Sequence, residues 1–168
     1  CARIIVVAGA DPTLLTAVVG EGAEVVDARD AEGSARATLR SRAVAAEQGH
    51  LLILRADMPL ISTRTLLELA GRHLGEGRML TCATAYLTDP HGFGRILRRN
   101  GEVHGIIRER DLTAAMRGQP EVNAGLYAAE AGWLWETLGT LPPDAATDSL
   151  GDLVAHAVER GGVEAFQV

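Results

Sequence analysis

Asp57 is the residue whose place in the sequence most clearly suggests chemistry. It follows the apolar run Leu51–Leu54, which is typical of a buried β-strand, and Pro59 restricts the chain two residues later. In open α/β sheets ligands bind at the carboxyl ends of the strands, where a carboxylate can hold Mg²⁺ against the phosphate oxygens of a substrate. The alternative is that Asp57 only caps the turn before Pro59. Its position alone favours neither role.

Two further segments carry groups that could meet a ligand. In His91–Arg95, glycines flank Phe93 and let the backbone approach a ligand closely, although the composition favours a simple glycine-rich turn. In Glu121–Gly125, the polar side chain of Asn123 interrupts an apolar run. Its amide offers donors and an acceptor that suit a sugar hydroxyl, but hydrogen bonds to neighbouring backbone are the commoner use.

The composition excludes several classes of protein. The chain has 168 residues, 47% of them hydrophobic and 23% charged, which suits one globular domain with a buried core. A net charge of −6 argues against nucleic acid as the main partner. Apolar runs such as Ile4–Ala10 are far shorter than a membrane span, and no signal peptide is recognisable. We therefore expect a cytoplasmic protein without membrane contact.

The reactive residue types narrow the chemistry further. All 16 basic residues are arginines, so no lysine chemistry is available. Two cysteines, Cys1 and Cys82, are too few for a disulfide framework or a zinc site, which fits a reducing compartment. The five histidines lack metal-ligand spacing, so we expect each on the surface or in a loop. Trp133 and Trp135 lie two apart on an expected helix, so we expect one in the core and the other at its edge.

The order of the predicted elements favours an α/β fold. Strands are expected at Arg3–Gly9, Ala23–Asp27, Leu51–Leu54 and Met79–Leu87, and helices between them at Thr13–Gly20, Ser34–Gln48 and Thr65–Leu74. Asp11 and Ser62 are expected to cap two of these helices. In the third helix, leucines 66, 67, 69 and 74 are expected on one face. This alternation is typical of a parallel sheet with helices on both sides.

After Leu87 the pattern changes. Asn100-Gly101 separates two strand-like segments, Gly94–Arg98 and Glu102–Glu109, and predicts a β-hairpin. A short helical or loop insertion, a strand, two helices and a last strand follow, at Asp111–Arg117, Glu121–Ala128, Glu130–Leu138, Asp148–Arg160 and Val163–Val168. We expect one partial domain over residues 1–168: a mostly parallel sheet with an inserted hairpin, incomplete at both ends.

Several motifs, taken in order, resemble those of bacterial N-acetylglucosamine-1-phosphate uridyltransferases. Leu52–Ser62 resembles their strand–Gly-Asp–x-Pro-Leu-Ile motif, and Asp89–Ile96 resembles Asp-Pro-x-Gly-Tyr-Gly-Arg-Ile. Asn100–Asp111 follows their Gly-x-Val-x-x-Ile-Val-Glu-x-Lys-Asp stretch without a gap, and Glu121–Tyr127 matches Glu-x-Asn-x-Gly. The order and spacing of the four motifs make the resemblance specific.

The resemblance implies a Rossmann-like nucleotide-diphospho-sugar transferase fold and transfer of UMP from UTP to N-acetylglucosamine 1-phosphate, with release of pyrophosphate. It implies that Asp57 is a Mg²⁺ ligand, that Gly94 contacts the acetamido sugar through its backbone, and that Asn123 contacts the sugar. The family's Gly-Thr pair falls on Gly33-Ser34, which are expected to bind substrate. Full-length relatives usually add an acetyltransferase domain and form trimers.

The chain also departs from the family pattern. The glycine-rich nucleotide loop expected before Arg3 and the second metal-binding Asn expected beyond Val168 are missing. The family's sugar-binding Glu falls on Arg108, which leaves Glu109 as a candidate replacement, and its uridine-reading Gln falls on Ala28. We therefore expect the isolated chain to be inactive, either as part of a longer active enzyme or as a diverged relative.

Arg55-Ala56 replaces the family's Tyr-Gly before Asp57 and crowds a place where backbone and ligand should approach closely. The missing ends favour the part of a longer enzyme, whereas such substitutions favour the diverged relative or a different sugar. The alternative function is a non-catalytic sugar-nucleotide-binding or scaffold module with the hairpin Gly94–Glu109 as its interaction surface.

Overall fold

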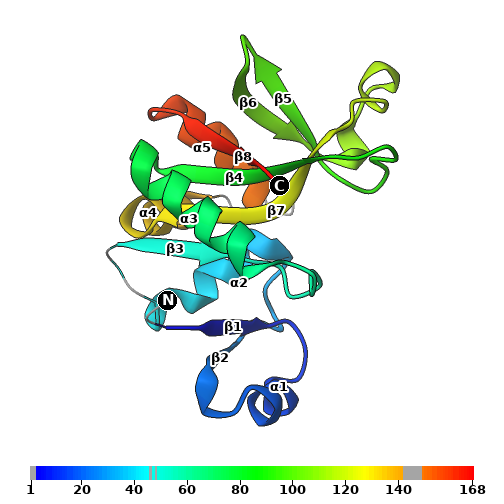
Figure 1. Ribbon diagram of the computed structural model, residues 1–168. Helices are drawn as coiled ribbons and strands as arrows, with labels where there is room; N and C mark the ends of the chain where they lie inside the picture. Colours follow the sequence, from blue (N-terminus) through cyan, green and yellow to red (C-terminus); the bar gives the residue numbers. More distant parts are fainter. Residues whose placement is uncertain (1–2, 46, 48, 142–148) are drawn as a thin grey trace.

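The structure is a computed structural model that describes residues 3–45, 47, 49–141 and 149–168. Strands and helices alternate along the chain only as far as β4 (Figure 1). In order, the elements are β1 (Ile5–Ala8), α1 (Pro12–Val19), β2 (Glu24–Asp27), α2 (Gly33–Arg40), β3 (His50–Ile53), α3 (Thr63–Glu76), β4 (Leu80–Tyr86), β5 (Arg95–Arg99), β6 (Glu102–Ile107), β7 (Glu121–Glu130), α4 (Ala131–Thr140), α5 (Leu153–Glu159) and β8 (Val163–Gln167). Cys1, the Pro142-Pro143-Asp144 break and the expected helix start at Asp148 lie outside the described residues.

The strands form two sheets, and the larger sheet is mixed. β1 and β2 pair in parallel as a separate two-stranded sheet. In the six-stranded sheet β7 runs antiparallel to β3, β4 and β5, whereas β4 and β8 are parallel. The expectation of a mostly parallel sheet is therefore wrong. The β5–β6 hairpin reverses the chain without a crossover helix, so β7 returns antiparallel to β4.

Helices cover both faces of the larger sheet (Figure 1). On one face, Leu69 of α3 packs with Leu126 of β7 and Phe166 of β8. On the other face, residues of α2, α4 and α5 form a larger apolar cluster with β4 and β7. Both sides of β7 are thus buried, which explains why this strand is apolar along most of its length.

Local sequence signals set the helix ends and the hairpin. The Asp11 side chain accepts a hydrogen bond from the Thr13 N–H, and that of Ser62 accepts one from the Thr65 N–H, as expected for N-caps. Asn100 and Gly101 have φ angles of 53° and 86°, which makes the expected tight turn between β5 and β6. α2 ends at Arg40, earlier than predicted, and a 3-10 turn, Ser41–Ala43, follows it.

The leucines of α3 do not share one face. Leu69 is fully buried, but Leu67 and Leu74 are mostly exposed. At about 100° per residue, Leu67 lies about 200° around the helix from Leu69, so the two side chains point to opposite sides. The prediction of a single leucine face is wrong for this reason.

Two predictions about aromatic and imidazole side chains are also wrong. Trp133 and Trp135 are both buried, because α4 is enclosed by the sheet and by α2 and α5. His73 is buried too. Its Nδ1 lies 2.9 Å from Thr81 Oγ1 and its Nε2 lies 3.0 Å from Nδ1 of His50, so it joins α3 to β3 and β4. Hydrogen-bond partners on both ring nitrogens make this burial tolerable.

Among the residues that the structure describes, no helix has the length and apolar character to cross a membrane.

Candidate active site

A bulge in β7 shapes the candidate site. Cys82 of β4 pairs with Tyr127, and Thr84 pairs with Asn123, so β7 has three residues between the paired positions where β4 has one. Within the bulge Gly125 has a φ of 74°, a conformation that glycine adopts without strain. The extra residues break the regular pairing and bend the strand beside an open cleft.

The cleft has a volume of about 470 Å³ and is lined by four segments and one isolated serine. The segments are the turn after β3, the loop before β5, the end of β6 and the bulge. The lining residues are Arg55, Asp57, Met58, Gly92, Phe93, Gly94, Ile106, Arg108, Glu109, Asn123, Ala124, Gly125 and Ser149. We call this the Asp57 cleft. It brings together four of the residues expected from the sequence: Asp57, Gly94, Glu109 and Asn123.

Gly33 and Ser34 do not line the Asp57 cleft. They begin α2, where Gly33 has a φ of 80° and both residues are exposed. The Ser34 hydroxyl accepts a hydrogen bond of 3.0 Å from the N–H of Leu150, the neighbour of the cleft residue Ser149. Their expected substrate contacts remain a prediction.

Asn123 holds the cleft wall together. Its backbone N–H donates to the Gly94 carbonyl at 2.9 Å, its side-chain Oδ1 accepts from the Gly125 N–H at 3.0 Å, and Nδ2 donates to the Tyr127 hydroxyl at 2.6 Å. Neighbouring groups of β7 therefore satisfy Oδ1 and one N–H of Nδ2, as in the alternative in which the amide serves its surroundings and not a ligand. Nδ2 has a second N–H, which makes no hydrogen bond within the part of the chain that the structure describes. Burial raises the pKa of Tyr127 well above its ordinary value, so this hydroxyl stays neutral.

Glu109 pairs with a buried arginine. Its Oε2 lies 2.8 Å from Nη1 of Arg95, whose side chain is 1% exposed. Arg95 also donates to the carbonyl oxygens of Phe93 and, at 3.1 Å, Arg117. Glu109 therefore balances the charge of the side chain that anchors the Phe93 loop. Its expected role as a substitute sugar ligand remains a prediction.

Asp57 is paired with Arg55 in a two-point arrangement. Arg55 Nε donates to Asp57 Oδ1 at 2.9 Å, and Nη2 donates to Oδ2. These hydrogen bonds lower the pKa of Asp57 and raise that of Arg55, so both groups are charged. Arg55 also lies across the bulge, because a Cβ placed at Gly125 would be 2.7 Å from its Cδ.

The donors in the Asp57 cleft do not fit a resident Mg²⁺ in this arrangement. Both oxygens of Asp57 accept hydrogen bonds from Arg55, and Glu109 is paired with Arg95. Within the described part of the chain, no three His, Cys, Asp or Glu side chains are grouped to hold a metal ion. The metal role of Asp57 remains a prediction, and it would require Arg55 to release the carboxylate.

Some cleft residues were not identified as site residues from the sequence. Arg55 precedes Asp57 by two positions at a strand end, a spacing that puts side chains on the same side of an extended chain and could have indicated the pair. Ile106 and Ser149 carried no such signal, because only tertiary packing brings them to the cleft.

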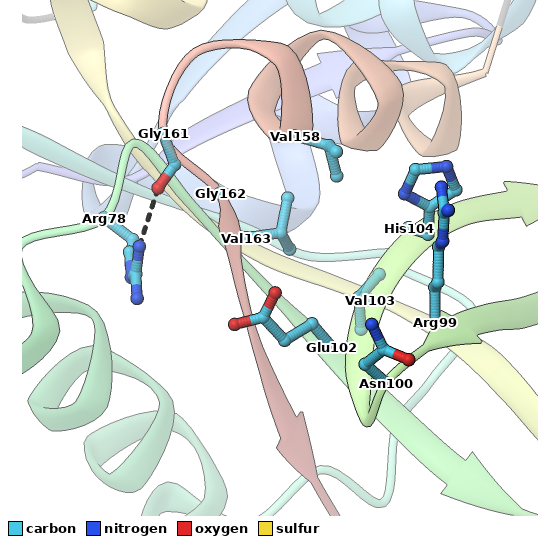
Figure 2. Close-up of a pocket in the computed structure, with 10 residues that line it drawn as sticks. All are labelled: Arg78, Arg99, Asn100, Glu102, Val103, His104, Val158, Gly161, Gly162 and Val163. Carbon is cyan, nitrogen blue, oxygen red and sulfur yellow. Dashed lines mark hydrogen bonds between the residues drawn. The ribbon is translucent and has the colours of Figure 1, made fainter.

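A second cleft, of about 450 Å³, lies between the β5–β6 turn and the start of β8 (Figure 2). Arg78 Nη1 donates to the Gly161 carbonyl at 2.6 Å on one side, and Arg99, Glu102 and His104 line the other. These three hairpin side chains are exposed. Part of the Asn100–Asp111 motif lines this cleft, but none of the site residues expected from the sequence does, so we place the candidate site in the Asp57 cleft.

Comparisons with known proteins agree on one family. The model of the MobA-like NTP transferase domain family matches residues 1–133. The bifunctional protein GlmU of Anaeromyxobacter sp. is 40% identical over 95% of this chain, and that of Pelobacter propionicus is 36% identical over 92%. GlmU of Kineococcus radiotolerans is 42% identical over 70% of this chain. The matched part spans 36%, 37% and 25% of these relatives, respectively.

The fold is also found in a solved structure. A crystal structure described as a glucose-1-phosphate thymidylyltransferase from Bacillus anthracis superposes with a TM-score of 0.68 at 13% identity. The match covers 93% of this chain and 63% of that chain. The nucleotidyltransferase-like α/β fold expected from the sequence is confirmed.

Proposed function

Because this chain belongs to the family of MobA-like NTP transferase domains, we propose that it forms the sugar-phosphate side of a sugar-1-phosphate nucleotidyltransferase. The proposed reaction is transfer of UMP from UTP to N-acetylglucosamine 1-phosphate, which gives UDP-N-acetylglucosamine, a cell-wall precursor, and pyrophosphate. The similarity to proteins named GlmU supports this choice of substrates.

One observation carries the proposal: Asp57, the Phe93-Gly94 loop and Asn123 line the same cleft. They come from motifs that are far apart in the sequence, and the resemblance implies a metal contact for Asp57 and sugar contacts for Gly94 and Asn123. A scaffold module would not need these residues to converge. These residues meet at the carboxyl end of β3, and open α/β sheets bind ligands at the carboxyl ends of their strands.

The chemistry expected in the cleft is positioning and charge stabilisation. An oxygen of the sugar phosphate attacks the α-phosphorus of the nucleotide in line, the bond to pyrophosphate breaks, and cationic groups stabilise the phosphate oxygens. In this chain the candidate cations of the cleft are guanidinium groups, those of Arg55 and Arg108. Arg108 also lies 3.3 Å from Asp111, which holds its side chain at the end of β6.

Asn123 and Gly94 would define the sugar-binding wall. The hydrogen bond between their backbones fixes the two segments, and the second N–H of the Asn123 amide is a donor for a sugar oxygen. At Gly94 a Cβ would lie 3.0 Å from Ile106 Cγ2 and 3.3 Å from the Ile107 carbonyl oxygen. Glycine is therefore the residue that lets this loop pack closely on β6 and leave room for a ligand.

In this proposal the metal and UTP are the parts of the reaction that the described cleft does not provide for. Family members generally use a divalent metal. In this chain Asp57 is the carboxylate that would bind Mg²⁺, and only in a state in which Arg55 has released it. We propose that UTP binds mainly through segments outside this sequence, so that the 168-residue chain alone does not form product. A cytoplasmic location and a trimeric full-length protein belong to the same proposal.

Titrations followed by NMR test the proposed function. N-acetylglucosamine 1-phosphate, UTP with Mg²⁺ and UDP-N-acetylglucosamine are each added to the ¹⁵N-labelled chain. We expect saturable shifts from the sugar phosphate at Gly94, Asn123 and Gly125, and none centred on Gly161 and Gly162 of the second cleft. Silence toward all three compounds would favour the scaffold alternative.

Two variants separate ligand contact from support of the wall. Asn123→Ala removes the amide, and we expect it to abolish sugar-phosphate binding. Tyr127→Phe removes only the hydroxyl that accepts from Nδ2, and we expect binding to persist. Equal loss of binding in both variants would assign Asn123 a purely structural role.

A further inference from the structure

The Arg55–Asp57 pair differs from an ordinary surface ion pair in its packing. Both side chains are more than 60% exposed, at 64% and 61%, so their charges reach the solvent of the Asp57 cleft. The stem of Arg55, however, fills the space over Gly125, where any Cβ would collide with it. The positive φ of Gly125 and the missing Cβ together make this place for the arginine stem.

The guanidinium keeps donors for another ligand. An arginine side chain has five N–H donors, and the two hydrogen bonds to Asp57 use two of them. The remaining N–H groups suit the oxygens of a phosphate, which arginine binds well because of its planar fork. Since the guanidinium stays protonated throughout the accessible pH range, its charge is permanent.

Arg55 and a divalent metal ion would compete for Asp57. Both carboxylate oxygens already accept hydrogen bonds from one side chain. A divalent cation bound to either oxygen would lie beside the guanidinium, and the two positive charges would repel each other. Occupation of Asp57 by the arginine and by a metal are therefore competing states.

We propose that Arg55 is the resident cation of the Asp57 cleft: its guanidinium takes the place beside Asp57 that a divalent metal would need, and binds the phosphate of the sugar ligand. This inference rests on the proposed function for the identity of the ligand. Asp57 is then a positioning residue that orients Arg55, and sugar-phosphate binding by this chain does not depend on Mg²⁺.

The first experiment measures the Kd of N-acetylglucosamine 1-phosphate by calorimetry, in EDTA and in excess Mg²⁺. We expect the two Kd values of the unmodified chain to agree within about twofold. Arg55→Gln removes the charge and should weaken binding by about tenfold or more, the effect expected from loss of a charged hydrogen bond. Arg55→Lys keeps the positive charge but lacks the planar, forked guanidinium. Its Kd for the sugar phosphate should lie between those of the unmodified chain and of Arg55→Gln.

The matched control is Arg64→Gln. Arg64 is also an exposed arginine paired with a carboxylate, that of Glu68 on α3, but it does not line the cleft. Arg64→Gln removes the same charge from the chain as Arg55→Gln, and we expect no change in the Kd of the sugar phosphate. Unmodified binding that needs Mg²⁺, or Arg55→Gln binding as tight as that of the unmodified chain, would overturn the inference.

A second readout needs no sugar. Binding of Mn²⁺, followed by loss of its free electron paramagnetic resonance signal, should be weak in the unmodified chain and at least several-fold tighter in Arg55→Gln. The gain should disappear in the double variant Arg55→Gln with Asp57→Asn. Equal Mn²⁺ affinity in the unmodified chain and in Arg55→Gln would show that the arginine does not occupy the metal's place.

The two readouts distinguish the possible failures. If the unmodified chain binds neither N-acetylglucosamine 1-phosphate nor UDP-N-acetylglucosamine, the proposed function and the phosphate role of Arg55 both fail. The Mn²⁺ titration then still decides whether Arg55 excludes metal from Asp57. If the sugar phosphate binds only with Mg²⁺, the proposed function stands and the inference about Arg55 fails.

Discussion

Replacing Arg95 with methionine should loosen the loop that forms one wall of the Asp57 cleft. Arg95 is the largest of the fully buried side chains in the described residues, and it donates to the carbonyl oxygens of Phe93 and Arg117. Its charge is balanced by Glu109, at 2.8 Å. Methionine keeps the length and the apolar stem of the side chain but removes every donor and the charge.

The structure sets the size of the effect. Breaking a buried ion pair by removing one partner costs about 3–5 kcal/mol, because the other charge is left uncompensated. The Glu109 side chain is 25% exposed and can be partly hydrated, and its Oε1 also lies 3.9 Å from Nη1 of Arg117, which places the cost near the lower limit. We therefore expect the free energy of unfolding to fall by about 3 kcal/mol, or the Tm by about 6–12 °C for a chain of this size.

Urea unfolding followed by tryptophan fluorescence measures this loss, since Trp133 and Trp135 are both buried. The control is Arg99→Met, on the same strand but exposed, which should change stability by less than about 0.5 kcal/mol. The sugar-phosphate Kd should also rise in Arg95→Met, because the Phe93 carbonyl loses its anchor. A loss below about 1 kcal/mol, or one no larger than that of Arg99→Met, would refute the reasoning.

Three further predictions concern the hairpin, the pH dependence and the buried thiol. Gly101→Ala places a side chain at a φ of 86° and should cost about 1–2 kcal/mol in urea unfolding, whereas a loss near zero would contradict the turn geometry. Hydrogen bonds from Arg98 lower the pKa of Glu121 below its ordinary 4.5 in the folded chain. The stability from this pair is therefore fully present above about pH 4.5 and is lost as the pH falls through the lowered pKa, so Glu121→Gln should flatten the Tm profile in that acidic range. Burial raises the pKa of Cys82 to about 12, so in a Cys1→Ser variant this thiol should react with a disulfide reagent at pH 8 only after unfolding; prompt reaction of the folded protein would show that Cys82 is accessible.

Local signals in the sequence were enough to predict most elements. The caps at Asp11 and Ser62 and the turn at Asn100-Gly101 depend on hydrogen bonds and φ angles within a few residues. The position of Asp57 after a buried strand is local too. The resemblance then assigned Asn123 and Gly94 to the same site, and the structure places both in the cleft with Asp57.

Other features depend on contacts between segments that are distant in the sequence. The direction of β7 depends on how many times the chain reverses before reaching it, and the burial of His73 depends on partners contributed by β3 and β4. The ion pair between Glu109 and Arg95 could not be predicted either, because the residues next to each of them in the sequence do not indicate the pairing.

The sequence by itself determined the elements and the residue types of the candidate site, because propensity, capping and turn geometry act over a few positions. Only the tertiary structure decided which partners those residues contact. The bulge at Gly125 admits the stem of Arg55, and that arginine holds both oxygens of Asp57. Steric fit and charge pairing between distant segments depend on their positions in space, and a pattern of neighbours along the chain does not contain those positions.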